Sequence, residues 1–123
     1  MKVKKLIPRQ LNDAIFHVTY YKEGMLSGWL VHPRLENPVK IQSVPQLLFS
    51  LDSIVSQEDV PIGYHAFEEV ALPETPIATI RLRILFREHY TWQGCAVWED
   101  RQMEAPFRSV LELIEILDEI LAD

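Results

Sequence analysis

One part of this chain, residues 14–55, resembles a later part, residues 80–121. The two parts align without a gap. The eight identical pairs are Gly28/Gly94, Val31/Val97, Ser43/Ser109, Val44/Val110, Leu47/Leu113, Leu51/Leu117, Asp52/Asp118 and Ile54/Ile120. Many other aligned pairs are apolar in both parts. An internal repeat defines the folding unit before any local pattern is read, so we expect two similar units.

Each unit opens with alternating apolar and polar residues. Phe16, Val18 and Tyr20 are the apolar members in the first unit, and the same alternation runs over residues 80–87 in the second. A period of two predicts strands with one buried face. A further β-rich stretch follows each strand, at residues 25–32 and 91–98, so the sequence predicts two hairpins.

Polar, proline-bearing segments then lead to Ser43 and Ser109, and each serine precedes a run with helical spacing. The apolar residues recur at i, i+3, i+4, i+7, i+10 and i+11, which forms one buried stripe. Ser43 with Gln46, and Ser109 with Glu112, have the spacing of a capping box. Both units are therefore predicted to end in a helix.

These elements predict an α+β fold and a single domain over residues 1–123, an ordinary size for one domain. We expect tandem ββα repeats, with repeat one at 14–55, a connecting strap at 56–77 and repeat two at 78–121. The repeats would form a four-stranded, mainly antiparallel sheet with both helices packed on one face and an internal pseudo-twofold axis. We expect an ordered strap with an edge strand near 66–72. The strand order is left open.

The charge balance limits the possible partners. Eighteen acidic and twelve basic residues give a net charge of −6, which disfavours bulk binding to DNA or to anionic membranes. Residues 1–10 carry +4, residues 11–77 carry −6 and residues 78–123 carry −4. No apolar run is long enough to span a bilayer, and the basic start lacks a signal-peptide core. We therefore expect a cytoplasmic protein.

The residues that usually carry chemistry are scattered. Four histidines stand singly, and none lies in metal-ligand spacing from Cys95, the one cysteine. Cys95 stands between Gly94 and Ala96 in a predicted strand, where it is expected to be a small hydrophobic residue and not a nucleophile. The glutamates of the second predicted helix recur along one side, as a solvated face would require. We predict no catalytic residues, no metal site and no cofactor, and hence a protein that is not an enzyme.

The outer face of the sheet is the first candidate for binding. If Phe16, Val18 and Tyr20 point toward the helices, the side chains between them point away. The candidate binding residues on this face are His17, Tyr21, Arg81, Arg83 and Arg87. Aromatic and guanidinium groups suit single-stranded RNA or DNA, and they also suit a protein interface. A third interpretation is that the face meets only water or the strap.

Phe49 is the second candidate. It stands on the outward side of the first predicted helix, where the aligned residue of the second helix is Glu115. An apolar side chain at such a place indicates contact with the strap, with a sister subunit or with a partner.

One sequence pattern resembles that of a family. The pattern comprises Ile84-Leu85-Phe86-Arg87, Thr91-Trp92-Gln93-Gly94, Trp98 and Phe107-Arg108-Ser109-Val110-Leu111-Glu112-Leu113, with Pro38, Ser43-Val44 and Leu47-Leu48 upstream. It is similar to small bacterial proteins with no known activity, over about two thirds of the chain. The resemblance therefore implies no function and no functional residue.

The function that these observations favour is a small, non-enzymatic cytoplasmic binding module, a regulator or an adaptor. It would engage a protein, including a second copy in a homodimer, through the outer sheet face or through Phe49 and the strap. The alternative is single-stranded RNA or DNA binding through the outer face, which the net charge disfavours.

Overall fold

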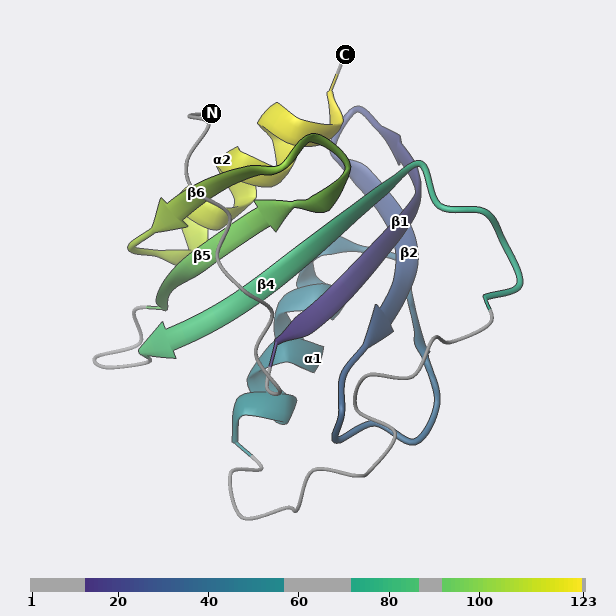
Figure 1. The fold of residues 1–123 in the computed structure, drawn as a ribbon, viewed down its shortest axis with the longest axis horizontal. Helices are drawn as coiled ribbons and strands as arrows, with labels where there is room; N and C mark the ends of the chain where they lie inside the picture. The colour runs from purple at the N-terminus through teal and green to yellow at the C-terminus, as the bar shows by residue number, and fades with distance from the viewer. Residues whose placement is uncertain (1–12, 57–71, 87–91, 123) are drawn as a thin grey trace.

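Six strands and two α-helices form the fold shown in Figure 1, a computed structural model that describes residues 13–56, 72–86 and 92–122. The first half contains β1 (Ala14–Lys22), β2 (Met25–Val31), β3 (Val39–Ile41) and α1 (Val44–Val55). The second half contains β4 (Ala78–Phe86), β5 (Gln93–Trp98), a short 3-10 helix (Glu99–Arg101), β6 (Met103–Phe107) and α2 (Val110–Leu121). The strand predicted near 66–72 lies outside the described residues, apart from Leu72.

The sheet corrects the predicted architecture. It has six antiparallel strands in the order β3-β2-β1-β4-β5-β6, so the predicted four-stranded sheet of ββα units is wrong. The sequence prediction missed β3 and β6, which are only three and five residues long. Both lie in segments that contain proline, and Pro106 is itself inside β6. Because β6 is an edge strand, a proline there removes no hydrogen bond from the interior of the sheet.

The helices begin where the sequence predicts. The Ser43 hydroxyl accepts a hydrogen bond from the Gln46 amide at 3.2 Å, and Ser109 does the same for Glu112 at 3.1 Å. The Gln46 and Glu112 side chains accept in turn from the amides of Gln42 and Arg108. Both helices thus satisfy first-turn amides by the same device.

The strand registers of the two halves coincide when residues 14–55 are aligned with residues 80–121. In the centre of the sheet Ile15 pairs with Arg81, and Ala14 and Phe16 pair with Leu82 and Ile80. Phe16 pairs with Leu30 between β1 and β2, and the aligned residues, Leu82 and Ala96, pair between β4 and β5. The pairs Gly28/Ile41 and Gly94/Phe107 correspond in the same way. Each half is therefore a βββα unit, and the strands pair in corresponding registers in both halves.

A register shift in β1 changes which side chains face the helices. It lies between Val18 and Tyr20, and a matching shift lies between Ile84 and Phe86. One extra residue in a strand reverses the alternation of side chains beyond it. Tyr21 therefore faces the helices and Tyr20 is exposed, the opposite of the predicted orientation.

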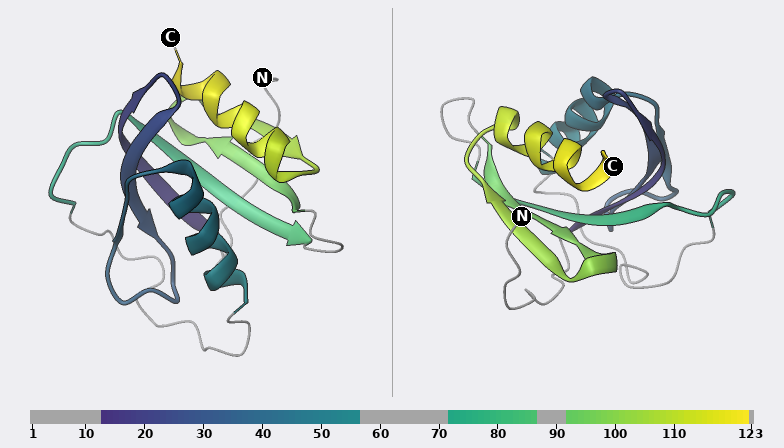
Figure 2. Two further views of the ribbon diagram at one scale, coloured as in Figure 1. Left: turned by 180° about the vertical axis from the view of Figure 1, so that it is seen from behind. Right: turned by 90° about the horizontal axis from the view of Figure 1, so that it is seen from above.

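One hydrophobic core lies between the sheet and the two helices. Both helices cover the same face of the sheet, as Figure 2 shows. The core combines alternate residues of the central strands, such as Phe16, Val18 and Ile80, with the buried stripes of α1 and α2. The fully buried helical side chains of the core are Leu47, Leu51 and Leu113.

The close packing at Gly94 yields a prediction. A Cβ atom at this position would stand 1.8 Å from the Arg83 carbonyl oxygen of the neighbouring strand, so a backbone must move to admit it. We expect Gly94→Ala to lower the free energy of unfolding by at least about 2 kcal/mol in urea titrations. Ser53→Ala, at an exposed position of α1, is the control and should change it by less than about 0.5 kcal/mol. Equal stabilities of the two variants would contradict the observed register.

Candidate functional site

The outer face of the sheet, opposite the helices, carries three rows of side chains that cross the strands. The middle row is Val31, Ile15, Arg81, Val97 and Glu104. One flanking row is Lys40, Trp29, His17 and Thr79, and the other is Asp13, Arg83, Cys95 and Pro106. The flanking rows correspond in the alignment of the two halves, so the pair His17/Thr79 in one occupies the place of Arg83/Asp13 in the other.

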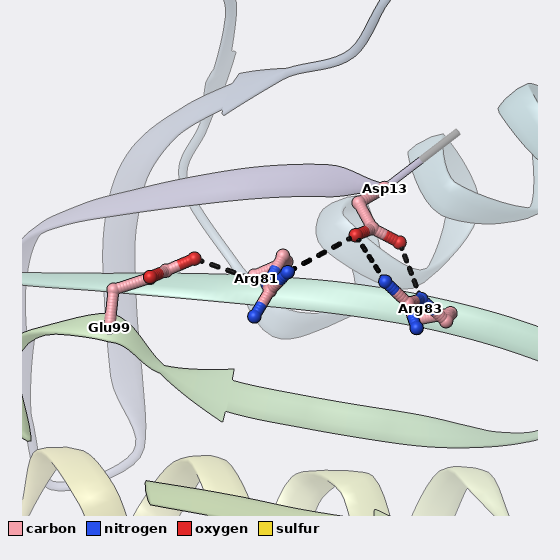
Figure 3. A network of polar contacts seen from close by, with 4 residues as sticks. All are labelled: Asp13, Arg81, Arg83 and Glu99. Carbon is pink, nitrogen blue, oxygen red and sulfur yellow. Dashed lines mark hydrogen bonds and ion pairs between the residues drawn. The ribbon is translucent and has the colours of Figure 1, made fainter. Parts of the chain in front are cut away.

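Asp13 is the centre of a buried ion-pair network (Figure 3). Its two carboxylate oxygens accept hydrogen bonds from Nε and Nη2 of Arg83, both at 2.7 Å. Nη1 of Arg81 lies 3.6 Å from Asp13 Oδ2, and Arg81 Nε lies 3.1 Å from Glu99 Oε1. Asp13 is 3% exposed and Arg81 2%. Removing charges from water to this extent is costly unless they are paired, and here each charge has a partner.

The two arginines therefore lie on the predicted face but are not displayed to a partner. Arg81 is fully buried, and Arg83 makes a bidentate contact with the Asp13 carboxylate. The hydrogen bond to Asp13 is the main reason that the pKa of Arg83 is raised. The pattern of the sequence could not reveal this, because Asp13 stands 70 residues from Arg83 and next to a different strand.

The other predicted binding residues are dispersed. His17 is half-buried, with Nδ1 3.3 Å from the Thr79 hydroxyl. Tyr21 lies on the helix side, where its hydroxyl donates to the Asp118 carboxylate of α2, and this bond raises the pKa of the tyrosine. Arg87 lies outside the described residues. The structure thus brings Arg81 and Arg83 together and separates Tyr21 from them.

Cys95 lies beside the ion-pair network, on the same face. It is buried, and burial raises the pKa of its thiol above the ordinary value, with Glu104 and Asp13 acting in the same direction and the two arginines against it. A raised thiol pKa keeps cysteine in the weakly nucleophilic protonated form at neutral pH. This environment is the opposite of the one that activates a cysteine nucleophile.

A second polar cluster, around Trp29, was not predicted. Glu74 Oε1 accepts hydrogen bonds from Lys40 Nζ at 2.8 Å and from the Trp29 indole at 3.3 Å. The Lys40 ammonium also lies 4.9 Å from the centroid of the Trp29 ring. The bond from Lys40 is the main cause of the lowered pKa of Glu74. The cluster ties the segment before β4 to β2 and β3, and no local pattern indicates it because its members are far apart in the chain.

The outward surface of α1 and α2, which we call the helix layer, combines exposed apolar groups with negative charge. Phe49 of α1 is 80% exposed and Leu111 of α2 is 65% exposed. The charged residues of the two helices are Asp52 in α1 and Glu112, Glu115, Asp118 and Glu119 in α2, and neither helix contains lysine or arginine. Their formal charge is −5.

A smaller apolar group lies where the β1–β2 hairpin meets the start of β4. Tyr20, Met25 and Ile77 are all at least half exposed. Met25 pairs with Lys22 and lies diagonally across from Tyr20, and the Ile77 amide bonds to the Val18 carbonyl. Unlike the apolar side chains of the helix layer, this group lies beside a basic residue, Lys22 of β1.

Among residues 13–56, 72–86 and 92–122, no three histidine, cysteine or carboxylate side chains are grouped so that they could hold a metal ion. Within the same residues, no helix has both the length and the apolar character needed to cross a membrane.

Comparisons of the chain with protein-family models, with curated proteins and with solved structures found no match.

The Asp13–Arg83 pair provides a prediction about stability. Removing one member leaves the other charge buried without its main partner, which typically costs about 3–5 kcal/mol. We expect Asp13→Asn and Arg83→Met each to lower the free energy of unfolding by about 3 kcal/mol. The double variant should lose at least about 2 kcal/mol less than the sum of the two single losses.

Chemical denaturation of the four proteins measures this cycle. Lys40→Met, which breaks the partly exposed contact with Glu74, is the control and should lower the free energy of unfolding far less than either single variant. Additive losses in the cycle would show that the two side chains do not depend on one another.

Proposed function

We propose that this chain is a cytoplasmic, non-enzymatic protein-binding module whose helix layer contacts the partner. The observation that carries the proposal is the exposure of Phe49. The first helix already has a complete buried stripe, including Leu47, Leu51 and Ile54, so the core does not explain an aromatic ring on its outer side. Aromatic side chains that become buried on association are common anchors of protein interfaces.

Two further features support the helix layer as the contact surface. Leu111 provides a second exposed apolar side chain on α2, so the apolar area is not limited to a single ring. The arginines of the outer sheet face are held in internal ion pairs, which leaves that face less suited to a partner than its composition suggests.

Binding of single-stranded RNA or DNA has less support. Its predicted contacts included Arg81, which is buried, and Arg83, which is partly buried, and both are paired with carboxylates. Phosphate binding by these side chains would require breaking those pairs. The net charge of −6 opposes nucleic acid as well.

We also infer that the two halves are copies of one βββα unit. The matching registers, the matching positions of the two β-bulges and the serine N-caps of both helices support this inference. The exchange of Glu115 for Phe49 at equivalent positions would then be a difference between the copies that serves binding.

Site-specific photocrosslinking tests the proposed surface. A photoreactive phenylalanine at position 49 should yield a discrete adduct of higher mass in cells, because its ring would be buried against the partner. The same group at Glu36, an exposed position between β2 and β3, should not. Excess wild-type protein should compete with the adduct, whereas excess Phe49→Ser protein should compete at least tenfold less well. The absence of any adduct that is specific to position 49 would refute the proposal.

A further inference from the structure

We propose that the helix layer of one molecule binds the basic N-terminal segment, residues 1–10, of a second copy of this chain. The inference rests on the proposed function, because it takes the helix layer as a binding surface and names its occupant. The N-terminal segment enters the argument through its sequence alone, since it lies outside the described residues.

The charges of the two surfaces are complementary. The helix layer carries five carboxylates and no basic side chain, whereas Lys2, Lys4, Lys5 and Arg9 give residues 1–10 a charge of +4 with no acidic residue among them. These four are a third of the twelve basic residues of the chain. Complementary potentials steer association and select the partner, and their effect is screened over about 8 Å at physiological salt.

The apolar groups of the two surfaces are complementary as well. Val3, Leu6 and Ile7 are interspersed with the basic residues of the segment. Phe49 and Leu111 stand exposed among the carboxylates of the helix layer. Burial of apolar side chains would supply the favourable free energy that exposed ion pairs alone contribute only weakly.

The position of Asp13 favours a second copy over the same molecule as the source of the segment. The described chain begins at Asp13, directly before β1, which is a central strand with two strands on one side and three on the other. Asp13 lies on the outer face, where it meets Arg81 and Arg83, and the helices cover the opposite face (Figure 2). The sheet therefore separates the start of β1 from the helix layer of the same molecule.

The contact can be reciprocal. If the segment of each molecule binds the helix layer of the other, two identical contacts are related by one twofold axis and close a dimer. A closed dimer leaves no unused segment or layer, so the expected product is a dimer and not an open chain of molecules.

Sedimentation equilibrium of the full-length protein tests this inference. We expect a monomer–dimer equilibrium whose dissociation constant rises at least tenfold between about 50 and 500 mM salt, because the contact involves several exposed charges. Reversing the segment (Lys2→Glu, Lys4→Glu, Lys5→Glu) changes its formal charge from +4 to −2, and reversing the helix layer (Asp52→Lys, Glu115→Lys, Glu119→Lys) changes its formal charge from −5 to +1. Each set should weaken dimerisation at least tenfold. Asp118 and Glu112 are left unchanged because they bond to Tyr21 and to the Arg108 amide.

The decisive arm mixes the two charge-reversed proteins. Each reversed segment, with a charge of −2, then meets a reversed layer of +1, and each native segment meets a native layer, so dimers of one molecule of each kind should form at least tenfold more tightly than the dimers of either variant alone. Urea midpoints equal to that of the wild-type protein establish that both variants fold. A wild-type protein that stays monomeric at low salt, a dimer indifferent to both reversals, or a mixture that does not associate would overturn the inference.

The outcome is separable from that of the proposed function. A monomeric protein that still forms a specific adduct from position 49 with a different protein leaves the binding module intact and removes only its assigned occupant. If the protein forms neither a specific adduct nor a dimer, the binding module and its assigned occupant are both refuted.

Discussion

The antiparallel pairing of β1 with β4 is the contact on which the rest of the fold depends. Each half of the chain has one helix and three strands, and one strand of each half, β3 or β6, is only three or five residues long. Joining the halves through their first strands produces one continuous sheet and places both helices on the same face. The pairing of Ile15 with Arg81 fixes this joint, and the side chains of Phe16 and Ile80 meet in the core beside it.

The buried charged residues of the outer face lie at the same joint. Asp13 precedes β1 while Arg81 and Arg83 belong to β4, so the ion-pair network spans the junction between the halves. At the equivalent place on the other side of the junction stand His17 and Thr79, with Nδ1 of the histidine 3.3 Å from the threonine hydroxyl. The outer face is thus part of the structural framework, and the exposed apolar side chains of the helix layer become the better candidate for binding.

Several features of the fold could be predicted from the sequence, and the reasons for the failures are physical. The helices carry long periodic stripes and side-chain caps, so their starts at Ser43 and Ser109 were predictable. The three residues of β3 and the proline-containing β6 are stabilised by their neighbours in the sheet and not by a local pattern. The bulge after Val18 leaves no mark in the alternation of residues, and it reverses the side chains of Tyr20 and Tyr21. Asp13 could not be predicted as the partner of Arg83 because the two residues are 70 positions apart in the chain. The exposure of Phe49, in contrast, followed from its position on the outward side of the helix.

The register of the central strand pair is the property to measure first. Nuclear Overhauser contacts between the backbones of β1 and β4 in the full-length protein test it directly. The described pairing predicts cross-strand contacts between Ala14 and Leu82, Phe16 and Ile80, and Val18 and Ala78. Contacts displaced by two positions, or contacts that join β1 to any strand other than β2 and β4, would contradict the pairing of the two halves and every inference built on it.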